Sequence, residues 1–458
     1  MPPKPRFLFM DKDDLVWRKL DEATDEWDIS IRTEETYRAV ANLILKYKKG
    51  QAEQMHPAAK GGYNVVYRLE YKDGSSVIMR VPIRDDNPLG LGPFIIMDYI
   101  EHHQNMSREL LDPKRPIDER PVLDPDISEE KLEFLYSQIA NILLQLSSLK
   151  FPRIGSLVEK EGGISTSVEG RPLIANMNDL VVHTSAPESI LPCQTYASAD
   201  EWYRALADMH MAQLVFQHND AVEDEDDARD KYVARQLFRK LAAEGRLAPE
   251  TPEPDDGFVL FSEDFRPANI LLDKDLRVVG VIDWEFAYAA PAQFGSDPPW
   301  WLLLQEPDYW DGGYRAWMEA YEPRLRTFLR VLEAEEEKMK MATDIAEKVG
   351  CISLVDGEKK EVPLSRRMRE SWEKRTWMRN YAARKSWAFD FVWWKFLDES
   401  YFGPNENQDC QARLELLSEP QREVMEAFVA RKMEESRNPG IVEWEDEHAA
   451  DRLAELLV

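Results

Sequence analysis

The sequence predicts an α+β fold in two lobes: a small β-rich N-lobe, a larger and mainly helical C-lobe, and a helical C-terminal extension. Between residues 60 and 100, apolar residues recur with period two around an Asp73-Gly74 turn, the pattern of a β-hairpin. Most other segments follow the 3.6-residue period of helices. Residues 257–290 return to short apolar runs that are typical of strands.

The spacing of apolar residues predicts one helix and three strands in the N-terminal part of the chain. Residues 30–49 carry an apolar stripe and predict a helix that stops near Gly50. Two strands over 63–71 and 76–82 form the predicted hairpin, and a third strand covers 93–100 after a link rich in Gly and Pro. The small β-rich unit therefore occupies about 60 to 100.

The rest of the chain is predicted to be mainly helical. A helix is expected over 128–149, hairpin character over 153–174, and one or two helices over 200–245. The acidic run 223–227 inside that region is interpreted as a solvated loop or a helix end. Residues 313–458 are strongly charged and rich in Trp, and we expect them to be helical again.

Composition restricts the possible partners and the compartment. The 458 residues include 58 Lys and Arg against 86 Asp and Glu, a net charge of −28 that disfavours nucleic acids and anionic membranes. Three scattered cysteines do not make a disulfide framework, and the apolar runs are too short for a membrane span or a signal peptide. We expect a soluble, cytoplasmic protein; the sequence does not indicate its oligomeric state.

One constellation of polar residues indicates chemistry. Asp264 is followed five residues later by Asn269, then by two apolar strands, and the second strand ends at Asp283. Phosphoryl transfer from ATP with Mg²⁺ needs such a set: a carboxylate that accepts the proton of the substrate hydroxyl, and oxygen ligands for the metal. The hairpin is predicted to bring Asn269 and Asp283 to the same edge. An Asp before a turn is by itself more often a cap residue.

These residues resemble the aminoglycoside phosphotransferase and choline kinase branch of the protein-kinase-like fold, and especially its fungal homologues, over about 60–330. The family's H-G-D-x-x-x-x-N motif corresponds to residues 262–269 of this chain, where Ser262 stands in the place of the histidine. The family's I-D-[WF]-E motif corresponds to residues 282–285. The resemblance implies Asp264 as the catalytic base, Asn269 and Asp283 as ligands of Mg²⁺, and Arg266 as a residue that steadies the γ-phosphate.

The small β-rich unit corresponds to the family's nucleotide lobe. The segment with Gly61, Gly62, Asn64 and Val65 resembles the phosphate loop, where backbone N–H groups approach the phosphates of ATP. A pair of glycines alone is more often only a turn.

Two further strands of this lobe are implied to contact the nucleotide. Arg80 stands where the family has the phosphate-binding lysine, and this exchange is not conservative. Met97 and Tyr99, on the strand over 93–100, would border the adenine.

The resemblance also implies a shortened N-lobe. In the family, a Glu-bearing helix and a strand lie between the lysine strand and the hinge strand, and they would need roughly 24 residues. In this chain only the short link of residues 83–92 or 83–93 lies between the corresponding strands. Either coding sequence is missing or the helix over 30–49 substitutes, with Glu34 or Glu35 as the partner of Arg80. The expected regions are a helical extension (1–55), the nucleotide-binding N-lobe (56–100), the phosphotransferase C-lobe (101–330) and the charged extension (331–458).

The first hypothesis is therefore an ATP- and Mg²⁺-dependent phosphotransferase acting on a hydroxyl of a small molecule. The alternative is a catalytically weak pseudokinase that serves as a binding module; a hydrolase is disfavoured because G-x-S-x-G and H-E-x-x-H motifs are absent. His210 and His218 are interpreted as packing or surface residues, and the Trp-rich stretches as core. If some of those aromatic residues line a pocket instead, a cationic or sugar-like acceptor is favoured.

Overall fold

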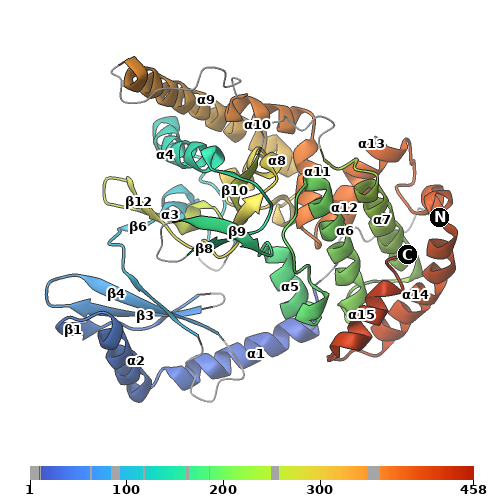
Figure 1. Cartoon of the computed structure of the whole chain (residues 1–458), viewed down its shortest axis with the longest axis horizontal. Helices are drawn as coiled ribbons and strands as arrows, with labels where there is room; N and C mark the ends of the chain where they lie inside the picture. The colour runs from blue at the N-terminus through green and yellow to red at the C-terminus, as the bar shows by residue number, and fades with distance from the viewer. Residues whose placement is uncertain are drawn as a thin grey trace. The chain divides into compact units, whose positions relative to one another are not determined.

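The computed structural model describes residue 10 and residues 12–61, 64–83, 93–116, 119–160, 165–184, 186–248, 257–348 and 362–458. The chain forms two compact units: residues 14–102, and a larger unit that joins the segment ending at Asp13 to residues 103–458. Helices and antiparallel sheets both occur, which confirms the predicted α+β class (Figure 1).

A five-stranded antiparallel sheet forms the body of the smaller unit. Its strands are β1 (Ala52–Met55), β2 (Ala59–Lys60), β3 (Asn64–Tyr71), β4 (Ser76–Pro82) and β5 (Ile95–Asp98). They lie in the order β1-β3-β4-β5, and β2 also pairs with β3. The predicted β3–β4 hairpin is confirmed, and Gly74 in its turn has a φ of +85°, which glycine adopts without steric cost. Most of the short link between β4 and β5 lies outside the described residues, but the two strands pair directly.

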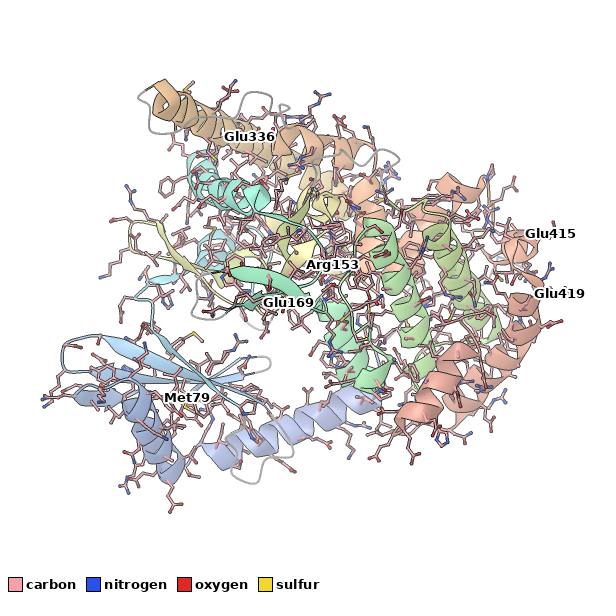
Figure 2. All side chains as sticks on the ribbon, viewed as in Figure 1. Met79, Arg153, Glu169, Glu336, Glu415 and Glu419 are labelled. Carbon is pink, nitrogen blue, oxygen red and sulfur yellow. The ribbon has the colours of Figure 1, made fainter. Side chains whose placement is uncertain are left out.

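Two helices precede this sheet: α1 (Asp14–Ile31) and α2 (Glu34–Tyr47). The single helix expected over 30–49 is α2 alone, because Thr33 caps it by accepting a hydrogen bond from the Thr36 N–H at 3.2 Å. Sequence periodicity did not predict α1, whose apolar face is sparse. The alternating residues of β3 and β4, among them Met79 (Figure 2), pack with Val40 of α2 in one core.

Three small antiparallel sheets lie in the larger unit, in the orders β13-β10-β7, β12-β11-β6 and β8-β9. Their strands are β6 (Gln104–Asn105), β7 (Lys150–Phe151), β8 (Ser156–Glu159), β9 (Thr166–Gly170), β10 (Phe258–Ser262), β11 (Ile270–Leu272), β12 (Val278–Val281) and β13 (Ala287–Ala290). The β8–β9 pair confirms the hairpin expected over 153–174, and β10 to β13 confirm the strands expected over 257–290.

Helices make up most of the larger unit. The α-helices are α3 (Met106–Leu110), α4 (Glu129–Ser148), α5 (Ala175–Thr184), α6 (Ala199–Phe216), α7 (Glu225–Ala243), α8 (Ala292–Gly295), α9 (Gly313–Lys348), α10 (Leu364–Glu373), α11 (Thr376–Arg384), α12 (Phe389–Val392), α13 (Asp398–Phe402), α14 (Glu419–Arg437) and α15 (Asp446–Ala454). Short 3₁₀ turns are η2 (Glu188–Ile190), η3 (Pro267–Asn269), η4 (Trp300–Leu303), η5 (Pro307–Tyr309) and η7 (Gln411–Leu416), and η6 (Trp393–Leu397) is a π-helical turn.

These helices share one hydrophobic core, to which residues of the strands and of the C-terminal helices also belong. Trp317, Trp377, Trp393 and Trp394 are buried in it, which confirms the interpretation of those Trp residues as core. Among the helices that the structure describes, none is both long and apolar enough to cross a bilayer.

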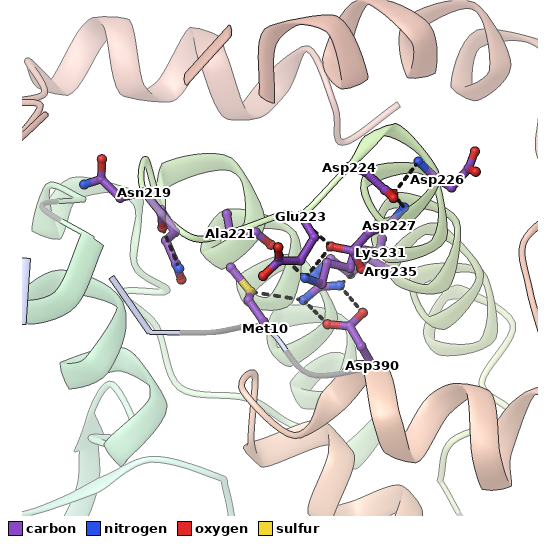
Figure 3. Close-up of polar contacts among 11 residues, drawn as sticks. Met10, Asn219, Ala221, Glu223, Asp224, Asp226, Asp227, Lys231, Arg235 and Asp390 are labelled. Atoms are coloured by element: carbon purple, nitrogen blue, oxygen red, sulfur yellow. Dashed lines mark hydrogen bonds and ion pairs between the residues drawn. The ribbon is translucent and has the colours of Figure 1, made fainter. Parts of the chain in front are cut away.

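Buried charges also hold this core together (Figure 3). The guanidinium of Arg235 on α7 donates to both carboxylate oxygens of Asp390 at 2.6 and 3.0 Å, and both side chains are almost fully excluded from solvent. Asp224 caps α7, while Asp227 is buried and pairs with Lys231 at 2.8 Å. The acidic run is thus a helix end, as expected, but Asp227 is not solvated.

The two histidines take packing and surface roles, as predicted. His210 is fully buried, hydrogen-bonds Ser386 Oγ through Nδ1 at 2.8 Å and stacks on Phe389. Burial lowers the pKa of His210 to about 3. His218 contacts the carbonyl oxygen of Asn438 through Nε2 at 2.9 Å.

Candidate active site

The loop that follows β10 positions the predicted base. Strand β10 is central in its sheet, paired with β13 and β7, and its last residue, Ser262, is buried. The chain then turns through Glu263 and Asp264 and enters η3, where Pro267 occupies the first turn and favours its start. A strand that is paired on both edges therefore fixes the point at which the chain turns into the loop that carries Asp264.

Asp264 is held by two neighbours on the same loop. Its Oδ1 forms an ion pair with Arg266 Nε at 2.7 Å, and its Oδ2 accepts a hydrogen bond from Asn269 Nδ2 at 2.8 Å. The Asp264 side chain is 28% exposed and that of Arg266 is 43% exposed. The carboxylate is therefore oriented by charge and hydrogen bonding while it stays accessible to a substrate.

The hydrogen bonds of Asn269 decide which atom faces a possible metal. Its Nδ2 donates to both the main-chain oxygen and the Oδ2 of Asp264, at 2.9 and 2.8 Å. Since both partners are acceptors, the amide nitrogen is assigned without ambiguity. The carbonyl oxygen Oδ1 is then the atom available as a ligand, which is the kind of ligand that Mg²⁺ prefers.

The hairpin β11–β12 brings Asp283 beside this loop, as the spacing predicted. Ile270 pairs with Val281, and the Ile282 N–H donates to the Asn269 carbonyl oxygen at 2.9 Å. Asp283 follows directly, with a φ of +65°. Left-handed backbone is uncommon outside glycine and is concentrated at functional sites, although Asp and Asn tolerate it better than other residues.

Aromatic rings flank this edge. The ring of Trp284 lies 6.2 Å from that of Phe265, and its Nε1 donates to the Val281 carbonyl oxygen at 3.1 Å. Phe265 is buried in the main core, whereas Trp284 remains partly exposed. The indole thus fixes the chain just after Asp283.

Glu263 is a site residue that the sequence analysis did not assign. Its carboxylate points away from solvent, accepting from the Ala175 N–H at 3.4 Å and the Tyr288 hydroxyl at 3.5 Å. Burial raises the pKa of Glu263, and the charges of Arg384 and Lys385 oppose this rise. The signal for it was the replacement of the small middle residue of H-G-D by a charged one, which requires partners in the fold.

The predicted phosphate-loop residues lie at the start of β3 in the smaller unit. The Gly61 N–H donates to the Asn64 carbonyl oxygen at 2.7 Å, and Gly62 lies outside the described residues. Val65 is 0% exposed and belongs to the core, so only its backbone can approach a ligand.

The other predicted nucleotide residues follow on β4 and β5. Arg80 is half-buried on β4, opposite Val66 and Ile95, on the face that does not carry Met79. Met97 pairs with Ile78. Tyr99 follows β5, and the guanidinium carbon of Arg68 lies 3.8 Å above its ring.

The structure does not support Glu34 or Glu35 as the partner of Arg80. Both lie exposed in the first turn of α2, and Glu34 pairs with Arg38 at 2.5 Å. Helix α2 packs on the core face of the sheet, whereas Arg80 lies on the opposite face. The proposed substitution by this helix is therefore wrong.

Two further features bear on ligand binding. Within the described ranges, no three His, Cys, Asp or Glu side chains are grouped as a metal site. Magnesium bound with phosphates needs only one or two carboxylates, so Asn269 and Asp283 fit that role. A pocket of about 400 Å³ lies elsewhere, between α6 and the C-terminal Leu453 and Leu457, and includes none of the predicted site residues.

Comparison with known proteins places part of this chain in context. Residues 136–332, which include Asp264, Asn269 and Asp283, match the model of the phosphotransferase enzyme family. Among curated proteins, none shows significant sequence similarity to the chain. The match covers 197 of the 458 residues, all of them within the larger unit.

Three of the solved structures that resemble the chain are described here, and all three have low TM-scores. Macrolide 2'-phosphotransferase type I is 12% identical, with 84% of this chain and 98% of that chain covered and a TM-score of 0.35. The apoenzyme of macrolide 2'-phosphotransferase MphH from Brachybacterium faecium is 13% identical, with 81% and 99% covered and a TM-score of 0.22. Amicoumacin kinase hAmiN in complex with AMP-PNP, Ca²⁺ and Ami is 12% identical, with 92% and 98% covered and a TM-score of 0.27. Likenesses this weak carry no functional argument.

Proposed function

We propose that this chain transfers the γ-phosphoryl group of ATP, with Mg²⁺, to a hydroxyl of a small molecule. The observation that carries the proposal is the hydrogen-bonded pair of Asp264 and Asn269 next to the hairpin that ends at Asp283. This set combines a proton acceptor with two oxygen ligands, and it lies inside the segment that matches the phosphotransferase family.

Each residue has a separate role in this proposal. The Asp264 carboxylate accepts the proton of the acceptor hydroxyl as the hydroxyl oxygen forms its bond to the γ-phosphorus, while the bond to the bridging oxygen breaks and ADP leaves. Asn269 Oδ1 and the Asp283 carboxylate would hold Mg²⁺, which when bound neutralises charge on the phosphates. Arg266 orients Asp264 and supplies a positive charge for the transferred group.

We also propose that the smaller unit binds the nucleotide, as the resemblance implies. Backbone N–H groups near Gly61, Asn64 and Val65 would approach the phosphates, and Arg80 would pair with them from β4. Residues Met97 and Tyr99 would border the adenine. The support is local: Arg80 lies on the face of the sheet opposite the one that packs in the core of the unit.

Calorimetric titration of the full chain with Mg-ATP tests the proposal first. We expect saturable binding that EDTA abolishes, and then ADP release with at least one member of a library of hydroxylated metabolites. An absence of Mg-ATP binding would contradict the proposal. Binding without turnover of any acceptor would instead favour the pseudokinase alternative.

A further inference from the structure

Arg68 joins three parts of the smaller unit on the sheet face opposite its core. Along β3 the buried residues Tyr67 and Leu69 face the core, so Arg68 between them faces the other way. Arg68 stands opposite Ile78 on β4, and Ile78 stands opposite Met97 on β5. These three side chains form one row across the sheet, and the row includes Met97, one of the two residues proposed to border the adenine.

The guanidinium of Arg68 is fixed by contacts in two directions. Its carbon lies 3.8 Å from the centroid of the Tyr99 ring. Nε and Nη2 both donate to Ser76 Oγ, at 3.1 and 3.0 Å, and Nη2 also donates to Glu101 Oε1 at 3.0 Å. A guanidinium can make both kinds of contact at once, because it stacks through its flat face and donates hydrogen bonds in its plane. Arg68 thus ties β3 and β4 to the segment just after β5.

The two polar partners of Arg68 differ in burial. Ser76 is 5% exposed, whereas the side chain of Glu101 is 65% exposed and that of Arg68 is 27% exposed. The ion pair with Glu101 is therefore weak, since water screens exposed pairs. The buried hydroxyl of Ser76 is the firmer anchor for the guanidinium that covers Tyr99.

Tyr99 is the other residue proposed to border the adenine, and its neighbours fix its ring. The Tyr99 N–H donates to the Ser76 carbonyl oxygen at 2.9 Å, which continues the β4–β5 pairing by one residue. Arg68 covers one face of the ring, and the ring of His102 lies 5.4 Å away, tilted by 44°. Tyr99 is still partly exposed. A planar base can therefore meet a ring that is oriented before the base binds, and this preorganisation lowers the entropy cost of binding.

We propose that Arg68 is a positioning residue for the adenine of ATP and that it acts through Tyr99. The inference rests on the proposed nucleotide-binding role of the smaller unit, and it deepens that role by naming a residue that sets affinity for the base and not for the phosphates. Lysine could not replace Arg68, because an ammonium keeps the charge but has neither a flat face to stack on the ring nor a fork to reach Ser76 and Glu101 together.

Two probes, Mg-ATP and Mg-tripolyphosphate, separate the base from the phosphates in calorimetric titrations of the full chain, the weaker probe being measured by competition. We expect the unmodified chain to bind Mg-ATP more tightly than Mg-tripolyphosphate. Arg68→Met should raise the Kd of Mg-ATP about three- to tenfold, because the freed Tyr99 ring must be ordered on binding. The Kd of Mg-tripolyphosphate should not change, whereas general damage to the unit would raise both constants.

Matched variants show whether the effect passes through Tyr99. In a Tyr99→Leu background, Arg68→Met should change the Kd of Mg-ATP by less than about twofold, as coupled residues behave. Arg68→Lys should weaken Mg-ATP binding to within about twofold of Arg68→Met, since the charge alone does not position the ring. Arg38→Met, which removes an exposed cation paired with Glu34 on α2, is the control and should change neither constant.

Hydrogen exchange tests the positioning itself in the absence of any ligand. Backbone amides of residues 99–102 should exchange faster in Arg68→Met than in the unmodified chain, and at an unchanged rate in Arg38→Met. Unchanged exchange in Arg68→Met would overturn the inference, as would equal affinities of the unmodified chain for the two probes.

The inference and the proposed function fail in different ways. If the unmodified chain binds neither probe, the phosphotransferase function is wrong and the role of Arg68 in nucleotide binding is wrong with it. If Mg-ATP binds and Arg68→Met leaves its Kd unchanged, or weakens both probes equally, the inference alone is wrong. Full affinity in Arg68→Lys, or additive losses with Tyr99→Leu, would likewise overturn only the inference.

Discussion

Replacing Asp264 and Asp283 by Asn, one at a time, separates proton transfer from metal binding. At residue 264 the amide keeps an oxygen that can accept from Asn269 Nδ2, and only the ion pair with Arg266 is lost. At residue 283 the φ of +65° matters, because Asn tolerates left-handed backbone, whereas Ala would add about 1 kcal/mol of strain. The Asn variants therefore change the chemistry and leave the backbone conformation intact.

The magnitudes expected for the two variants differ in kind. The ion pair of Asp264 with Arg266 is partly exposed, and such pairs contribute about 1 kcal/mol or less, so Asp264→Asn should lower Tm by only about 2 °C. Loss of the general base should lower turnover by about 10² to 10⁴. Asp283→Asn should instead raise the Kd for Mg-ATP by about tenfold or more, because it removes a charged metal ligand.

Calorimetry with Mg-ATP and a coupled assay of ADP release measure the two effects on the same samples. Asp275→Asn, at an exposed position in the turn of the same hairpin, is the matched control and should leave both quantities unchanged. Equal loss of nucleotide affinity in the variants at 264 and 283 would refute the division of roles, as would full turnover by Asp264→Asn.

Four further predictions follow from the described contacts. Asn269→Ala should raise the Mg²⁺ concentration needed for half-maximal ATP binding, since it removes Oδ1; an unchanged magnesium titration would count against this. Arg235→Met should lower the free energy of unfolding by about 3–5 kcal/mol by leaving the Asp390 carboxylate buried, and adding Asp390→Leu should restore much of it in urea denaturation. Burial raises the pKa of Asp297 from 3.8 to about 6. The folded protein therefore binds this proton more tightly than the unfolded chain, and the contribution of Asp297 to the free energy of unfolding falls as the pH rises from about 4 to about 6. In Asp297→Asn, the free energy of unfolding should lose up to about 3 kcal/mol of its decrease over this pH range. Glu34→Gln should leave Mg-ATP affinity unchanged, and a loss comparable to that of Arg80→Met would restore the pairing that the structure contradicts.

Features set by neighbours in sequence were predictable, and those set by distant contacts were not. The β3–β4 hairpin and the approach of Asn269 to the residue before Asp283 follow from strand periodicity and a short turn, both of which are local. Helix α1 was not predicted from the sequence, because only Val16, Trp27 and Ile31 are buried along its eighteen residues. That spacing gives a weak periodic signal against a strongly charged background.

Glu263 shows the same limit at the site. Its carboxylate accepts from the Ala175 N–H and from the Tyr288 hydroxyl, which lie 88 residues before it and 25 residues after it, and no local period relates these residues. The signal in the sequence was the charge next to Asp264, which needs a partner wherever the fold provides one.

The sequence itself already contained the argument against pairing Arg80 with the helix over 30–49. Residues on either side of Arg80, Met79 and Val81, are apolar, so strand alternation places the Arg80 side chain on the face opposite the core. A helix with an apolar stripe packs that stripe on the core face, and α2 does so through Val40. The two requirements exclude each other on a single sheet. A carboxylate partner for Arg80, or the phosphates of a nucleotide, must therefore approach from the other face, which the core of the smaller unit does not occupy.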